Sequence, residues 1–287
     1  MEIALEDGER IDSLHIGNFR IIQHKNFFCF GMDAVLLSDF AFSRIDFAEK
    51  KLKILDLCSG NGIVPLLLCG KALSRQSWNL PGENFSSENI LLNNSGAHFY
   101  ALEIQEKIAD MARRTVILNN LQGKISVKNG DLCKIENFYD ENSFDAVTCN
   151  PPYILPSEGR QSPNLERMIA RQEICCSLKN VLDAAFFALK NGGSFFMVHR
   201  PERFEEICSA LESSGLKIRN YRFVKPFENE DAKMVLFHCL AEKEGGAEQN
   251  GNNSAGAEIS PLVVYREKGV YTLETEKIYG RKADESF

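Results

Sequence analysis

The residues best suited to chemistry are Asn150, Pro151, Pro152 and Tyr153, which directly follow the apolar run Phe144–Cys149. That run predicts a buried strand, and two consecutive prolines end it because each lacks a backbone N–H and has a fixed φ. The amide oxygen of Asn150 and the carbonyl of Pro151 could accept the two hydrogens of a planar amino group, while the ring of Tyr153 stacks on it. For an isolated Asn-Pro-Pro-Tyr sequence, a plain turn is the alternative.

A glycine-bearing turn after an earlier predicted strand offers room for a cofactor. Residues 53–58 predict a strand, and Gly60 and Gly62 precede a helix predicted over residues 63–73. The glycines would let a ligand lie against bare backbone, and the helix N-terminus behind them favours anionic or polar groups. As a dinucleotide signal this is only half of a G-x-G-x-x-G pattern, so it predicts a nucleotide or nucleoside site of some kind.

Two acidic residues end or follow the next predicted strands. Glu103 ends the strand predicted over residues 98–103, where its carboxylate could accept both hydroxyls of a ribose; a helix-initiating acid is the alternative. Asp131 follows the strand predicted over residues 124–129. It could accept an exocyclic amine of adenine, with Leu132 packed on the ring, or it could be an ordinary turn residue.

Asp33 precedes an apolar helix predicted over residues 34–42. It could cap this helix, which is the simpler interpretation, or it could face a cofactor together with Gln23 and Lys25. The alternating residues 1–30 predict short strands that cover one end of the domain.

The predicted elements alternate between strands and helices. This order predicts an α/β fold with a doubly wound, mostly parallel sheet, and strands over 216–225 and 234–241 predict an antiparallel edge. We expect N-terminal strands and a capping helix in 1–45, a main domain in 46–243 with a surface insertion at about 74–97, a mobile linker in 244–258, and a C-terminal hairpin and tail in 259–287.

Composition limits the classes of function. The 287 residues carry a net charge of −7, so binding to nucleic acid would need a local basic patch. When the chain is divided into residues 1–150, 151–225 and 226–287, only the middle part has a net positive charge. Nine cysteines without metal spacing predict free thiols in a reducing cytoplasm and no metal site. The acidic N-terminus does not look like a signal peptide, and no apolar run is long enough to cross a membrane.

In this order, the glycine turn with Asp56, Glu103, Asp131 and Asn-Pro-Pro-Tyr resembles the motif series of class I methyltransferases that use S-adenosyl-L-methionine. More narrowly, the chain resembles the bacterial tRNA1(Val) adenine-N6 methyltransferase family from about residue 19 to 272. The blocks that carry this resemblance are Phe30–Leu37, Leu55–Pro65, Glu103–Gln105, Arg171–Glu173 and His199–Arg203.

The resemblance implies a Rossmann-like domain with a seven-stranded sheet and methyl transfer to the N6 amine of adenosine 37 in a valine tRNA. It implies catalytic roles for Asn150, Pro151, Pro152 and Tyr153. The residues expected at the cofactor are Gln23, Lys25, Asp33, Asp56, Cys58, Gly60, Gly62, Glu103, Ile104, Asp131, Leu132 and Asn150. We expect a cytoplasmic monomer whose partner is tRNA, with no membrane and no metal.

Five arginines around the predicted pocket are candidate phosphate contacts, although surface arginines are usually only solvated. They are Arg160, Arg167, Arg171, Arg200 and Arg203. Two alternatives remain open. The same quartet could hold a protein glutamine amide, although the sequence predicts no separate N-terminal helical domain of the kind that such enzymes use, or the chain could be a non-catalytic RNA-binding protein with this fold.

Overall fold

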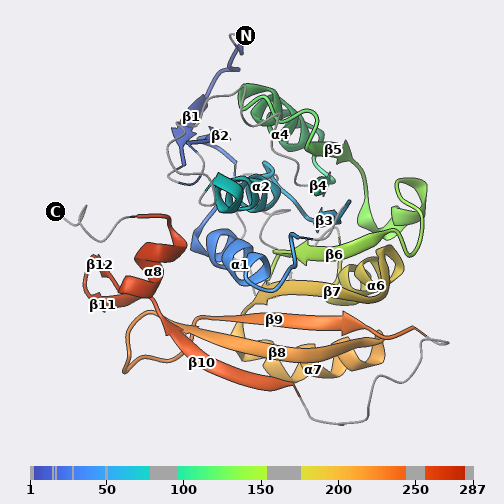
Figure 1. The fold of residues 1–287 in the computed structure, drawn as a ribbon, viewed down its shortest axis with the longest axis vertical. Coiled ribbons are helices and arrows are strands. Elements are labelled where there is room, and N and C mark those ends of the chain that lie inside the picture. The colour runs from blue at the N-terminus through green and yellow to red at the C-terminus, as the bar shows by residue number, and fades with distance from the viewer. Residues whose placement is uncertain are drawn as a thin grey trace.

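The structure is a computed structural model that describes residues 3–14, 16, 18–27, 29–48, 51–77, 96–153, 176–243 and 256–281. Its centre is an eight-stranded sheet in the order β10-β8-β9-β7-β6-β3-β4-β5 (Figure 1). The strands are β3 (Lys53–Leu57), β4 (His98–Glu103), β5 (Ile125–Asn129), β6 (Phe144–Cys149), β7 (Leu189–His199), β8 (Leu216–Lys225), β9 (Met234–Ala241) and β10 (Ala257–Val263).

Seven of these strands confirm the predicted Rossmann-like sheet. β5, β4, β3, β6 and β7 run parallel to one another, and β9 pairs antiparallel with both β7 and β8. The eighth strand, β10, was not foreseen. It pairs in parallel with β8 and forms the outer edge of the sheet.

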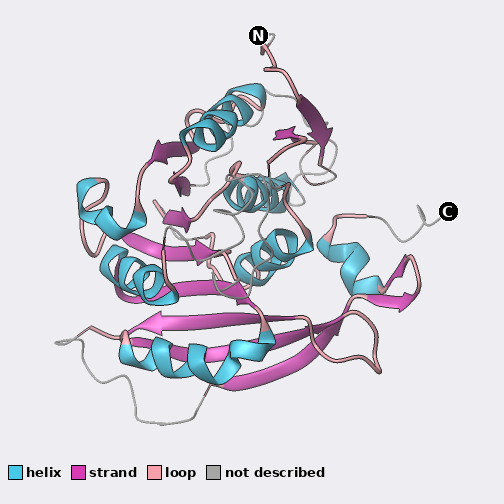
Figure 2. Cartoon of the chain, turned by 180° about the vertical axis from the view of Figure 1, so that it is seen from behind, coloured by secondary structure: helices cyan, strands magenta, loops and turns pink. Residues whose placement is uncertain are grey.

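Buried side chains alternate between the two faces of the sheet, as the period of a strand requires. Ile54 and Phe196 belong to one apolar core, whereas their chain neighbours Leu55 and Phe195 belong to the other. The first core packs against α1 (Met32–Phe42) and α2 (Ile63–Ser77), and the second against α6 (Leu178–Ala188) and α7 (Phe204–Ser213). Accordingly, α6 and α7 lie behind the sheet in Figure 1 and in front of it in Figure 2.

The remaining helices are short or lie near the sheet edge. The 3-10 turn η2 (Pro201–Arg203) leads directly into α7, while α4 (Glu106–Leu118) and the 3-10 turn η1 (Leu132–Asn137) follow β4 and β5. Within the described part of the chain, no helix is long and apolar enough to cross a membrane.

The predicted N-terminal strands form a separate antiparallel hairpin of β1 (Glu9–Ser13) and β2 (Arg20–His24). Side chains of α4 and of its C-cap residue Asn119 hold β2 in place. The N–H of Ile22 donates to Thr115 Oγ1 at 3.0 Å, and the N–H of Arg20 donates to Asn119 Oδ1 at 2.8 Å. Glu9 also pairs with Arg114 of α4 at 2.5 Å, so the hairpin is fixed to the body of the domain.

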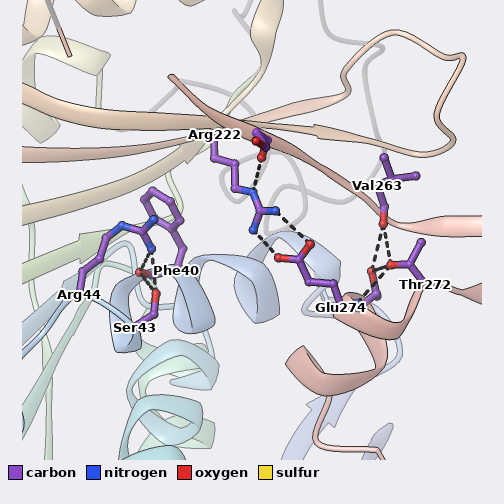
Figure 3. A network of polar contacts seen from close by, with 9 residues as sticks. Phe40, Ser43, Arg44, Arg222, Val263, Thr272 and Glu274 are labelled. Carbon is purple, nitrogen blue, oxygen red and sulfur yellow. Dashed lines mark hydrogen bonds and ion pairs between the residues drawn. The ribbon is translucent and has the colours of Figure 1, made fainter. Parts of the chain in front are cut away.

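After β10, a short hairpin forms from β11 (Tyr265–Glu267) and β12 (Val270–Tyr271), followed by α8 (Leu273–Ile278). Arg222 of β8 binds the Glu274 carboxylate through both terminal nitrogens, at 2.7 and 3.0 Å, and its Nε donates to the carbonyl of Ser260 in β10 (Figure 3). One arginine therefore joins an inner strand, the edge strand and the last helix. Most of the predicted insertion at 74–97 and of the linker at 244–258 lies outside the described residues.

Candidate functional site

A cleft opens at the carboxyl ends of β3, β4 and β6 and beside the loop after β5. It encloses about 960 Å³ of empty space, its open mouth included. This is where a doubly wound sheet places its ligand, because the helices that follow neighbouring strands leave the sheet on opposite faces. The cleft brings together most of the predicted site residues, namely Asp56, Cys58, Gly60, Glu103, Ile104, Asp131, Leu132, Asn150 and Pro152.

Glu103 is buried at the end of β4. One carboxylate oxygen accepts the backbone N–H of Gly60 and the other accepts that of Gln105, each at 2.9 Å. Burial raises the pKa of Glu103 above its usual value, and the two backbone donors partly oppose this effect. Each oxygen keeps a further lone pair, so the carboxylate can accept two more hydrogen bonds from a ligand in the cleft.

The glycine turn leaves bare backbone at the cleft. Gly60 has φ +56°, and a Cβ at this position would have no atom within 4 Å, so the space beside it is open. Gly62 has φ +81° and lies against Ala112 of α4 instead, which explains why it does not line the cleft. Cys58 also adopts a left-handed conformation, with φ +54°, which turns the chain sharply out of β3.

Asp56 lies at the floor of the cleft, with only 2% of its surface exposed. Burial raises its pKa to about 7, and the hydroxyl of Thr148, which donates to Oδ1 at 2.7 Å, opposes this rise. The neighbouring strands β3 and β6 pair Asp56 with Thr148 in register, so the sheet itself brings the two side chains together.

Asn150 lines the cleft beyond the end of β6. Its side-chain oxygen contacts the hydroxyl of Tyr153, which also lies 2.8 Å from Oδ2 of Asp33 at the start of α1. The Tyr153 ring packs edge-on against His199, at 5.4 Å between ring centroids. Tyr153 therefore stands beside Asn150 rather than in the lining of the cleft.

The sequence matches a model of the RMKL-like, methyltransferase domain family over residues 62–211, slightly more than half of the chain. The chain belongs to this family. Among curated proteins it is 22% identical to a tRNA1(Val) (adenine(37)-N6)-methyltransferase of Vibrio campbellii over 190 residues, which is 66% of this chain and 68% of that protein.

Two solved structures support the same fold for this methyltransferase domain. One is a predicted O-methyltransferase from Agrobacterium tumefaciens, with a TM-score of 0.59, 17% identity, and coverage of 87% of this chain and 96% of that one. The other is described as a class I S-adenosylmethionine-dependent methyltransferase from Listeria monocytogenes, with a TM-score of 0.54, 11% identity, and coverage of 83% and 67%. At these identities the likeness concerns the fold alone.

Several predicted site residues of the methyltransferase domain lie outside the cleft lining. These are Gln23, Lys25, Asp33, Gly62, Pro151 and Tyr153. Gln23 is buried, its side-chain oxygen accepts the N–H of Phe30 at 3.2 Å, and its amide donates to Asp12. It therefore supports the segment that carries Phe30, which does line the cleft.

Sequence reasoning missed the other residues of the cleft lining, among them Phe30, Ala34, Asn61, Gln105 and Cys176. Asn61 donates to the carbonyl of Ile22 at 3.3 Å, which ties the glycine turn to β2. The side-chain oxygen of Gln105 is buried and has no hydrogen-bond partner in the described structure. The sequence signal that could have identified Gln105 is its position: it lies two residues after Glu103, between the end of β4 and the start of α4.

Of the five predicted phosphate contacts, two lie in the described structure. Arg200 is exposed, and its guanidinium carbon lies 5.7 Å from the centre of the Tyr153 ring. Arg203 forms an ion pair with Glu206 at 2.5 Å. Arg160, Arg167 and Arg171 lie outside the described residues. No group of His, Cys, Asp and Glu side chains in the described ranges is arranged to hold a metal ion.

Proposed function

We propose that this methyltransferase moves a methyl group from S-adenosyl-L-methionine to the exocyclic N6 amine of an adenosine in tRNA, with adenosine 37 of tRNA1(Val) as the substrate to test first. The observation that carries the proposal is that the amide of Asn150 lines the same cleft as Glu103, Gly60 and Asp131. The side chain expected to accept the hydrogens of the substrate amine and the residues expected to bind the cofactor nucleoside thus lie in the same cleft.

The cleft suits an aminoacyl nucleoside cofactor. The open space at Gly60 accommodates a group that lies against backbone, and Glu103 has lone pairs for the ribose hydroxyls. Asp131 and Leu132 border the part expected to hold the adenine, together with the partly exposed Ile104. When bound, S-adenosyl-L-methionine supplies a sulfonium methyl group, which is already a good electrophile.

The protein must therefore act on the amine, whose lone pair is delocalised into the purine ring. The Asn150 side-chain oxygen and the Pro151 carbonyl can accept its two hydrogens, which favours a more tetrahedral nitrogen and directs its lone pair into the cleft. Positioning of this kind supplies several kcal/mol in intramolecular reactions, roughly 7–11 in the best cases. The mechanism needs no His or Cys nucleophile.

Two observations support RNA as the carrier of the amine. The relative from Vibrio campbellii is named for a tRNA adenine. Arg200 is exposed beside Tyr153, where it could meet a phosphate of the substrate. A base in an anticodon loop is already in a single strand, so it can enter a pocket at small unstacking cost.

The deciding experiment is to incubate the purified protein with S-adenosyl-L-methionine and bulk tRNA, digest the tRNA, and quantify methylated nucleosides by mass spectrometry. The expected product is N6-methyladenosine, mapped to position 37 by sequencing the modified tRNA1(Val). Release factors serve as parallel substrates, and methylglutamine in them without methylated tRNA would assign the site to a protein amide instead.

The variant Asn150→Ala tests the role of Asn150 in methyl transfer. It should bind S-adenosyl-L-methionine with nearly unchanged affinity in a calorimetric titration and lose most of its turnover, because the amine then lacks one acceptor. Turnover near that of the wild type would remove Asn150 from the mechanism. A wild-type protein that binds tRNA without methylating any substrate would favour the non-catalytic alternative.

A further inference from the structure

The hydroxyl of Tyr153 lies between two side chains that come from different elements. On one side is Oδ2 of Asp33, at 2.8 Å, in the first turn of α1. On the other side is the side-chain amide of Asn150, directly after β6, placed with its oxygen toward Tyr153. Asp33 itself does not line the cleft, so any role that it has in the reaction must pass through Tyr153.

The number of available hydrogens fixes which group donates and which accepts in these two contacts. A tyrosine hydroxyl has one hydrogen, and a carboxylate can only accept. If Tyr153 donates to Asp33, its oxygen is left to accept from Asn150, so the amide must direct its NH2 group toward Tyr153. Nitrogen and oxygen of a side-chain amide have nearly the same shape, so their assignment follows from the hydrogen-bond partners. The Asn150 oxygen then faces the amine of the substrate.

We propose that Asp33 is a positioning residue for methyl transfer, which fixes the orientation of the Asn150 amide through the hydroxyl of Tyr153. This inference rests on the proposed function of Asn150 as the acceptor of the substrate amine. The opposite orientation would direct the NH2 group of Asn150 toward another amine, and two donors cannot bond to each other.

The contacts from Asp33 through the Tyr153 hydroxyl to the Asn150 amide are called the relay below. Neighbouring groups hold Asp33 and Tyr153 in position. Oδ1 of Asp33 accepts the N–H of Ala34 at 2.9 Å, so its carboxylate is held by the start of α1 while Oδ2 contacts Tyr153. The Tyr153 ring contacts His199 of β7 and lies under Arg200. Burial, and next the negative charge of Asp33, raise the pKa of Tyr153 well above its usual value, so the hydroxyl keeps its hydrogen.

Asp33→Asn tests the relay while it keeps a side-chain oxygen for the N–H of Ala34. Asp33 lies in the first turn of α1, where loss of its negative charge has only a small effect on stability, so Tm should fall only slightly. The single oxygen of asparagine would remain on the N–H of Ala34, and its NH2 group would then face Tyr153. The Tyr153 hydrogen would turn toward Asn150, which would reverse the amide. We expect kcat to fall roughly ten- to a hundred-fold, with the Kd of S-adenosyl-L-methionine unchanged.

Tyr153→Phe keeps the ring and removes the relay, and its kcat should fall by a similar factor. The double variant Asp33→Asn/Tyr153→Phe should be no slower than the slower single variant, because both changes act on the same amide. Multiplied effects would show that the two residues act independently. Asp39→Asn is the matched control on α1. It weakens an ion pair with Lys71 instead, and kcat should stay at the wild-type value.

A second readout needs no substrate. In a ¹H–¹⁵N spectrum, the side-chain amide signal of Asn150, identified by its loss in Asn150→Ser, should shift in both Asp33→Asn and Tyr153→Phe but not in Asp39→Asn. An unchanged signal or an unchanged kcat in Asp33→Asn would overturn the relay. Absence of N6-methyladenosine from the wild-type reaction would instead overturn the proposed function, and the spectrum would still decide whether Asp33 orients Asn150.

Discussion

The carboxylate of Glu103, at the end of β4, accepts the backbone N–H of Gly60 from the turn after β3 at 2.9 Å. The same side chain that we expect to bind a ribose thus also holds the turn expected to contact the rest of the cofactor. Its second oxygen binds the N–H of Gln105, so both oxygens already have a structural role.

Replacing Glu103 by Gln should therefore affect both stability and binding. A glutamine has one oxygen for two N–H donors, and the unpaired donor should cost roughly 1–3 kcal/mol in the free energy of unfolding. The Kd of S-adenosyl-L-methionine, measured by calorimetry, should rise about tenfold or more. The exposed Glu106→Gln on α4 is the control and should leave both values near those of the wild type. Unchanged affinity in Glu103→Gln would separate Glu103 from the cofactor.

Asp56 should make the protein less stable as pH rises. Its pKa is about 7 in the folded state and near 3.8 in the unfolded chain, so between these values the folded state binds more protons. The free energy of unfolding of the wild type should then fall, relative to that of Asp56→Asn, by on the order of 4 kcal/mol from pH 4 to pH 7. Urea denaturation of the cofactor-free protein at several pH values measures this difference. A constant difference would show that Asp56 does not titrate in this range.

Arg200 should contribute to the salt dependence of tRNA binding. A guanidinium that neutralises one phosphate releases about one counterion, so Arg200→Ala should reduce the slope of log K against log salt by about one. Filter binding at a series of KCl concentrations gives this slope. Arg113→Ala on the surface of α4 is the control, since Arg113 pairs with Glu106. A wild-type affinity that does not change with salt would rule out phosphate contacts.

The contact between Arg222 and Glu274 should hold the C-terminal elements on the sheet. Glu274→Gln leaves a weaker hydrogen bond and should lower local stability by about 0.5–1 kcal/mol, because Glu274 is half exposed. Hydrogen exchange should speed up in α8 and β10 and stay unchanged in β3. The exposed pair of Lys217 and Glu242 offers the control variant Glu242→Gln. Uniformly faster exchange across the sheet would mean that α8 unfolds only with the whole domain.

Local sequence signals predicted the central strands well. Asn150 was expected to follow a strand because Pro151 and Pro152 cannot continue one, and β6 ends at Cys149. β8 and β9 occupy the predicted ranges. They could be predicted because the apolar residues of each strand and the turn residues that flank it are neighbours in the sequence. Such signals need no knowledge of the tertiary fold.

Features that depend on distant partners were not predictable in this way. β10 contains Pro261, which argues against an inner strand, and only an edge position beside β8 with a shift in register between Ile259 and Leu262 accommodates it. The contact of Asp33 with Tyr153 joins residues 120 positions apart. The sequence suggested a helix cap at Asp33, but α1 begins one residue earlier, with Gly31 as its N-cap and Asp33 in the first turn. Nothing local indicated which side chain the second oxygen of Asp33 would meet.

The hydrogen bond from Asn61 to the carbonyl of Ile22 sets a limit on how far the chain can be shortened. β2 supplies main-chain partners to Asn61 beside the cleft, to Thr115 of α4 and to Asn119 directly after α4. A fragment that starts at α1 would keep every strand of the central sheet, yet it would leave these polar side chains without their partners. The smallest working unit of this enzyme must therefore include the N-terminal hairpin.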